Sequence, residues 1–185
     1  SSMNSMVVDI LAGMDKHIDD VGLDVSHLDV RLGGNAVIRD LDFRARGGEI
    51  VAIVGRNGVG KTTLLRALTG LQRYQGAILA SGQTPDLAMV FQNPDLQLFN
   101  ATVREEILFK VPEPDARWYD WLLDVLGLCD YEGTPPLLLS EGEKKRVALA
   151  TVLMRKPHHG VLLDEPSLGQ DVVHKTHLIR VARAL

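Results

Sequence analysis

The sequence predicts an α/β fold, and three observations carry this prediction. Short apolar segments rich in β-branched residues alternate with segments of helical periodicity, which is typical of α/β cores that contain parallel strands. One apolar segment leads directly into a glycine-rich loop and then into a helix-forming run. A long helical stretch, about residues 94–157, interrupts the alternation and indicates an inserted helical subdomain.

Composition limits the functions that the chain can have. Its 185 residues suffice for one sizeable domain, and 45% of them are hydrophobic. The formal net charge is −4 and there is no long basic run, so we expect no nucleic-acid partner. The single cysteine, Cys129, allows no internal disulfide and fits a reducing compartment. No apolar run approaches the ~20 residues that span a bilayer, and the first residues lack the basic start of a signal peptide.

The N-terminal half is typical of an antiparallel β region followed by a first core strand. Residues 1–20 are an extension, for which a short amphipathic helix and the end of an upstream linker both remain open. Residues 21–46 alternate in places between apolar and polar around a turn signal at Gly33 and Gly34, which predicts antiparallel strands. The run "EIVAIVG", residues 49–55, predicts a buried strand, and a helix is expected over about residues 61–71.

The C-terminal half adds strands and helices. "GAILASG" and "LAMVFQ" predict two strands, and the apolar residues between 118 and 126 can line one face of a helix. A further helix should follow Ser140 and end near Lys156, because Pro157 restricts the residue before it. "GVLLDEP" predicts a last buried strand, and the tail an amphipathic helix. The predicted fold is therefore α/β with a mixed sheet, an antiparallel β subdomain and a helical insertion.

Residues 55–62, "GRNGVGKT", match the phosphate-loop pattern G-x-x-x-x-G-K-[ST] in full. The glycines let backbone N–H groups turn inward and cradle phosphate oxygens, while the following helix points its positive end at them. Lys61 can reach the β- and γ-phosphates, and the Thr62 hydroxyl can hold Mg²⁺. The alternative is a glycine-rich turn with a chance lysine. The apolar strand before the loop and the helix after it argue against that alternative.

A phosphate loop needs a carboxylate to complete its metal site, and "VLLDEP" supplies one. Asp164 follows a strand, at the end where ligands bind in open α/β sheets, and we expect it to hold Mg²⁺ through water. Glu165 faces another way, because successive strand residues alternate, so it is a candidate to orient or deprotonate an attacking water. The alternative is that these acids merely end a strand.

The segment "LSEGEKKR", residues 139–146, has the pattern of a capping box. Ser140 is placed to cap a helix N-terminus, and Glu143 follows three residues later. The three basic residues after it are typical of a solvated helix face.

Five motifs now stand in a fixed order. They are the phosphate loop "GRNGVGKTT", then "VFQNP", "LSEGE" and "VLLDEP", and finally "SLGQD" at residues 167–171. In this order they resemble the phosphate loop, Q-loop, signature motif (usually LSGGQ), Walker B strand and D-loop of ATP-binding cassette (ABC) proteins. The chain therefore resembles an ABC ATPase domain with a P-loop NTPase core, and the resemblance covers about residues 21–185.

The resemblance implies ATP and Mg²⁺ as cofactors and gives roles to named residues. The residues that it implies in ATP binding are Gly55, Asn57, Gly58, Gly60, Lys61, Thr62 and Thr63. The implied metal ligands are Thr62, Gln92 and Asp164, and the implied catalytic residues are Glu165, Lys61 and Gln92. Ser140 and Gly142 are implied to contact the ATP that is bound by a partner ATPase domain.

A finer resemblance lies after the Q-loop. "FQNPDLQLFNATVREEI", residues 91–107, is similar to the same segment in ATPases of energy-coupling factor (ECF) transporters, which import vitamins or transition-metal ions. It implies a second ABC ATPase domain, separate or in tandem, and integral membrane subunits that dock on residues 94–99. It also implies a place on the cytoplasmic face of the cell membrane. Because each complete site needs two domains, we expect this chain alone to be nearly inactive.

The sequence departs from the family pattern at three places. Glu141 stands where the signature usually has glycine, and Glu143 where glutamine is common, so we expect a usable but weakened signature. No aromatic residue precedes the second strand, so we expect apolar packing as the only contact to adenine, and we interpret Leu32 in the matching segment as a plain strand residue. The chain also ends before the family's switch histidine, because His174 and His177 follow the D-loop too soon. We therefore interpret the chain as truncated at its C-terminus.

Two other functions remain open at this point. One is a regulatory half of a tandem ATPase that binds ATP without hydrolysing it, against which Glu165 argues. The other is an ABC ATPase that acts in solution on nucleic acid or the ribosome. The acidic balance and the importer-like segment argue against this second alternative.

Overall fold

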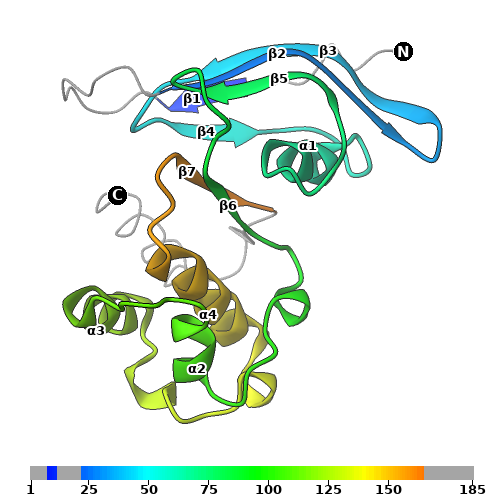
Figure 1. Ribbon diagram of the computed structural model, residues 1–185. Coiled ribbons are helices and arrows are strands. Elements are labelled where there is room, and N and C mark those ends of the chain that lie inside the picture. Colours follow the sequence, from blue (N-terminus) through cyan, green and yellow to red (C-terminus); the bar gives the residue numbers. More distant parts are fainter. Residues whose placement is uncertain (1–7, 12–21, 165–185) are drawn as a thin grey trace. The chain divides into compact units, whose positions relative to one another are not determined.

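The computed structural model describes residues 8–11 and 22–164 (Figure 1). The chain divides into two compact units. The first unit comprises Ser1–Leu87 and His158–Leu162, and the second comprises Ala88–Pro157 and Leu163–Leu185. No helix in the described ranges is long and apolar enough to cross a membrane. The α/β class that the sequence predicts is confirmed.

The first unit contains an antiparallel sheet with the strand order β3-β2-β5. Its elements are β1 (Val8–Leu11), β2 (Leu23–Leu32), β3 (Asn35–Ala45), β4 (Ile50–Ile53), α1 (Lys61–Leu68) and β5 (Gln75–Ala80). Strands β2 and β3 form the hairpin predicted around Gly33 and Gly34, both of which have positive φ. Helix α1 contacts β2 below this sheet, and the apolar faces of the two elements are buried (Figure 1).

Two expectations about the first unit are corrected. Residues 8–11 form a strand instead of the amphipathic helix that their spacing allowed, because Val8 and Ile10 pair with β4. The segment 49–55 does contain a strand, but it is not buried. Ile50 is 57% exposed, since β1 is the one sheet neighbour of β4 in the described part of the chain.

The second unit is built around one long helix, as the predicted insertion requires. Its helical elements are η1 (Pro94–Leu96), α2 (Val103–Leu108), α3 (Ala116–Leu126), η2 (Cys129–Tyr131), η3 (Pro136–Leu138) and α4 (Glu141–Met154). Helix α4 packs against α2, α3 and η1 (Figure 1). Its apolar residues and those of α3 form the core, and the Trp118 indole N–H donates to the Leu153 carbonyl at 3.1 Å.

Strands β6 (Leu87–Val90) and β7 (Gly160–Leu163) pair with each other in a two-stranded sheet. Both were expected from their apolar runs. The loop before β7 is fixed by hydrogen bonds to Asp86. The Asp86 backbone N–H donates to His159 Nδ1 at 2.9 Å, and the His158 backbone N–H donates to the Asp86 carboxylate at 3.1 Å. His159 thus helps to hold the loop before β7 in place.

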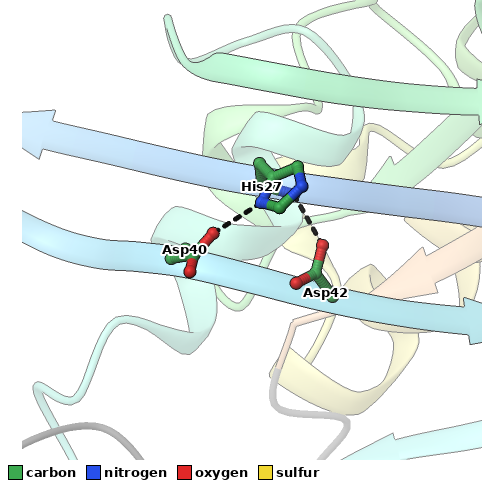
Figure 2. Close-up of side chains that lie close together, drawn as sticks. All are labelled: His27, Asp40 and Asp42. Atoms are coloured by element: carbon green, nitrogen blue, oxygen red, sulfur yellow. Dashed lines mark hydrogen bonds and ion pairs between the residues drawn. The ribbon is translucent and has the colours of Figure 1, made fainter.

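An exposed ion pair joins β2 and β3 where their pairing register shifts (Figure 2). The ring Nδ1 of His27 lies 2.7 Å from a carboxylate oxygen of Asp40, and the His27 backbone N–H donates to Asp42 at 2.7 Å. The hydrogen bond to Asp40, followed by the negative charge of Asp42, raises the pKa of His27. Both His27 and Asp40 have positive φ, so these contacts hold a backbone geometry that L-residues rarely adopt.

We predict that the stabilising effect of His27 depends on pH. A histidine whose pKa is raised by folding contributes stability that is complete below its unfolded pKa, about 6.5, and is lost as the pH rises through its folded pKa. His27→Asn, which tolerates positive φ, should therefore lower the melting temperature more at about pH 5.5 than at about pH 9. Thermal unfolding of His158→Asn is the control. An equal loss for His27→Asn at both pH values would contradict the prediction.

Candidate phosphate site and signature helix

The phosphate loop lies in the first unit, between β4 and α1. Gly58 and Gly60 have φ of +78° and +110°, the left-handed region that favours glycine. A Cβ on Gly60 would lie 2.8 Å from a methyl carbon of Val37, so no side chain fits where the loop meets β3. The Val59 N–H donates to the Arg56 carbonyl at 3.2 Å and closes the turn. The glycines therefore allow a loop that is tight enough to surround a small anion.

Helix α1 begins without a side-chain cap. Its N-cap is Gly60, no side chain hydrogen-bonds to its first turn as a cap, and the first turn contains no acid. The other α-helices of the described residues are capped by the side chains of Thr102, Asp115 and Ser140. A helix N-terminus carries partial positive charge and N–H donors, so this end of α1 fits a phosphate.

Lys61 already contacts the loop. Its ammonium group donates to the Gly55 carbonyl at 2.7 Å and to the Arg56 carbonyl at 3.1 Å. These bonds hold the charge over the loop from the first residue of α1. Thr62 and Thr63 follow in the same turn and are half-buried. The first unit thus brings together the predicted residues from Gly55 to Thr63.

The predicted residues Gln92 and Asp164 lie in the second unit. Asp164 directly follows β7 and is 6% exposed. Its backbone N–H donates to the Val90 carbonyl at 3.0 Å, which places Asp164 beside the end of β6. Gln92 follows Val90 by two residues. Gln92 itself is exposed. A buried carboxylate and an exposed amide at neighbouring strand ends are oxygen donors of the kind that Mg²⁺ prefers.

Ser140 is the N-cap of α4, and the predicted capping box is confirmed. The Glu143 carboxylate oxygen Oε2 accepts from both the Ser140 backbone N–H and the Ser140 hydroxyl, each at 2.7 Å. Hydrogen bonds from the Tyr131 hydroxyl and from Ser140 lower the pKa of Glu143 to about 2. Gly142 is exposed in the same first turn. Glu143 is thus a charged, triply hydrogen-bonded group at neutral pH.

Residues 94–100 form a braced loop that carries two exposed apolar side chains. Leu96 is 68% exposed and Phe99 is 67% exposed. The Gln97 side chain accepts from the Phe91 N–H at 2.9 Å and donates to the Met89 carbonyl at 3.0 Å. The Lys144 ammonium binds the Asp95 carboxylate at 2.8 Å and ties the loop to α4. The backbone is thus held from several sides while its apolar residues face solvent.

The sequence did not indicate the residue that holds this loop most directly. Glu106 on α2 is 1% exposed, and its Oε2 accepts from the N–H groups of Phe99 and Asn100 at 2.8 and 2.7 Å. Glu105 beside it is exposed. The only sequence signal is that position 106 falls between the buried Val103 and Ile107 on one face of the helix.

Several predicted features lie outside the described residues. They are the proposed catalytic Glu165, the D-loop at residues 167–171, His174, His177 and the predicted tail helix. Leu32, which we interpreted as a plain strand residue, is the exposed last residue of β2, beside the hairpin turn. The assignments of residues to ATP, metal and catalysis remain predictions.

Comparison with known proteins decides the family. The family model described as "ABC transporter" matches residues 38–168. The chain belongs to the ABC transporter family. The resemblance to the ABC family is therefore confirmed, and so is the likeness to ECF-type ATPases among its relatives.

The relatives of this ABC chain include proteins of ECF transporters. It is 36% identical over 167 residues to the energy-coupling factor transporter ATP-binding protein EcfA of Methanothermobacter thermautotrophicus, covering 80% of this chain and 53% of the relative. It is 34% identical over 168 residues to EcfA1 of Thermotoga maritima, covering 84% of this chain and 64% of the relative. The chain thus spans less than two thirds of the length of these relatives.

A solved structure agrees with these relatives. CbiO1 from Clostridium perfringens, described as part of the ABC transporter complex CbiONQ, matches with a TM-score of 0.77 and 29% identity. The match covers 90% of this chain and 76% of that chain. An ABC ATPase domain with the predicted inserted helical unit is therefore the fold that both the sequence and the structural comparison support.

We predict that Glu106 stabilises the second unit. Glu106→Ala leaves two part-buried N–H groups without their acceptor, which should lower the free energy of unfolding by about 2–4 kcal/mol. Urea unfolding followed by circular dichroism measures this loss. The control is Glu105→Ala, which removes an exposed acid and should cost less than about 1 kcal/mol. Equal losses for the two variants would contradict the role of Glu106.

Proposed function

We propose that this chain is the ATP-binding and ATP-hydrolysing part of a membrane importer of the ECF type. The observation that carries the proposal is the first turn of α1, which follows a positive-φ glycine loop, lacks a side-chain cap and begins with Lys61. Such an end offers backbone N–H donors and positive charge to the phosphates of a nucleotide. The chemistry of the loop therefore fits ATP, which the family resemblance implies.

The residues of the loop have distinct tasks in this proposal. Lys61 exchanges its bonds to the Gly55 and Arg56 carbonyls for the β- and γ-phosphate oxygens. Thr62, Gln92 and Asp164 would hold Mg²⁺, which would supply positive charge to balance the negative charge of the phosphates. Glu165 orients or deprotonates the attacking water.

The names of the relatives support the partners and the cargo that we propose. The proposed partners are a second ABC ATPase domain and integral membrane subunits, and the proposed location is the cytoplasmic face of the cell membrane. One relative is named an energy-coupling factor ATP-binding protein, and another, from Bacillus subtilis, is a putative HMP/thiamine import ATP-binding protein with 38% identity. The name of the second relative supports a vitamin as cargo. A transition-metal ion remains the other class of cargo that the resemblance of residues 91–107 implies.

Residues 94–99 are proposed as the surface that receives the membrane subunits. Leu96 and Phe99 are large apolar side chains that face solvent from a braced backbone. Exposed apolar groups on a fixed loop suit a protein partner, because little conformational entropy is lost when they become buried.

We predict that Lys61→Ala lowers ATP turnover by the full-length protein, assembled with its membrane subunits, about a hundredfold or more. The cause is the loss of the charge that the loop holds over the phosphates. Arg66→Ala removes an exposed cation from the same helix and should retain turnover within about threefold. Turnover by Lys61→Ala at the level of Arg66→Ala would contradict the proposal.

The variant Glu165→Gln in the same assay separates hydrolysis from nucleotide binding alone. In a protein that only binds ATP, this variant would not change the turnover.

We also predict that the double variant Leu96→Ser, Phe99→Ser binds the membrane subunits about tenfold more weakly or worse. The reason is the loss of two exposed apolar side chains that would become buried in the complex. Co-purification of the full-length complex, titrated with the ATPase chain, measures the change. The control is Leu71→Ser, which removes an apolar side chain of similar exposure from the first unit. Equal weakening by the control would contradict the proposed surface.

A further inference from the structure

The signature helix satisfies its own serine. The Ser140 hydroxyl has one proton, and it donates this proton to Glu143 Oε2 at 2.7 Å. The Ser140 backbone N–H donates to the same oxygen at 2.7 Å. In this arrangement neither donor of Ser140 is available to a second acceptor.

The carboxylate that takes both donors is firmly held. The Tyr131 hydroxyl also bonds to Glu143, and this bond raises the pKa of Tyr131 while it lowers that of Glu143. Hydrogen bonds to a charged acceptor are roughly twice as strong as neutral ones. The negative charge also lies at the positive end of α4, where a helix stabilises it. A phosphate would be attracted by the same donors and the same helix end.

We propose that Glu143 is a positioning residue that keeps Ser140 occupied until the ATP of a partner ATPase domain displaces its carboxylate. The inference rests on the proposed function, in which Ser140 contacts the γ-phosphate bound by that partner. Glu143 and the phosphate compete for one hydroxyl proton and repel each other as like charges. Pairing of the two domains therefore requires Glu143 to turn away, and each ATP must overcome this contact.

Glu141 provides a matched comparison. It precedes Gly142 in the same first turn and carries the same charge, but its side chain has no hydrogen bond to Ser140 in the described part of the chain. If repulsion of phosphate alone weakened the signature, the two acids would act alike. If occupation of the hydroxyl matters, Glu143 must have the larger effect.

The test compares Glu143→Gln with Glu141→Gln in the full-length protein, paired and assembled with its membrane subunits. Glutamine keeps the shape of the capping residue and removes the charge from its bond to Ser140. Glu143→Gln should lower the KM for Mg-ATP about three- to tenfold, at least twice the effect of Glu141→Gln, with little change in kcat. The melting temperature without nucleotide is the control. If it is not raised in Glu143→Gln, a lower KM cannot result from a more stable helix.

A second background tests the mechanism. In Ser140→Ala there is no hydroxyl to release, so adding Glu143→Gln should change KM less than about twofold. An unchanged or higher KM for Glu143→Gln, an equal effect of Glu141→Gln, or a full effect in the Ser140→Ala background would each overturn the inference.

The proposed function fails in a different way. If Ser140→Ala binds and hydrolyses ATP as well as the wild type does, Ser140 does not contact nucleotide, and the composite site falls together with this inference. If Ser140→Ala is impaired and Glu143→Gln gains nothing, the composite site stands and the inference alone is wrong. Light scattering gives the same comparison without turnover. It measures the concentration of AMP-PNP at which two ATPase chains pair.

Discussion

The first turn of an α-helix carries backbone N–H groups that the helix itself cannot satisfy, and the chain meets this requirement in two ways. Thr102 and Asp115 cap α2 and α3 with side-chain oxygens, as structural helices commonly require. Helix α1 has no such cap and follows a glycine loop instead. The N-terminus of α1 therefore has no side-chain cap and fits the phosphate that we propose for it.

Helix α4 combines both solutions. It is capped by Ser140 and Glu143, and it is also the helix whose N-terminus the family uses for nucleotide in the proposed pair. A cap satisfied from within the chain lets α4 form the core of the second unit before any partner binds. The same cap then competes with the ligand, because one hydroxyl serves both. Structural stability and ligand affinity are therefore coupled at this residue.

A buried carboxylate has a comparable role in the loop after Gln92. Glu106 accepts two backbone N–H groups and fixes the segment that ends in the exposed Phe99. Removing a charged group from water is costly unless it gains strong hydrogen bonds, and two short bonds to backbone donors supply them. The buried carboxylate of α2 thus fixes the backbone of the loop that exposes Phe99 to solvent.

Local chemistry was predictable from the sequence, and contacts between distant segments were not. The capping box follows from the spacing of Ser140 and Glu143, and the β2–β3 hairpin from Gly33 and Gly34, because both need only neighbouring residues. The strand at residues 8–11 depends on pairing with β4, more than forty residues away in the register of Val8 with Ile53. For Glu106 the sequence shows only that it shares a helix face with Val103 and Ile107, and its bonds to the N–H groups of the loop before α2 depend on the folded loop.

Glu141 and Glu143 both differ from the usual signature and carry the same charge, but they would affect a bound phosphate in different ways. An interaction can shift the equilibrium between separate and paired ATPase domains only if its free energy differs between these two states. Glu141 is exposed, so water screens much of its effect on a nearby phosphate. Glu143 must exchange three hydrogen bonds when a phosphate takes its place, and their loss belongs to the paired state alone. The residue that makes α4 begin correctly is therefore also the one that sets how much ATP is needed to join two such domains.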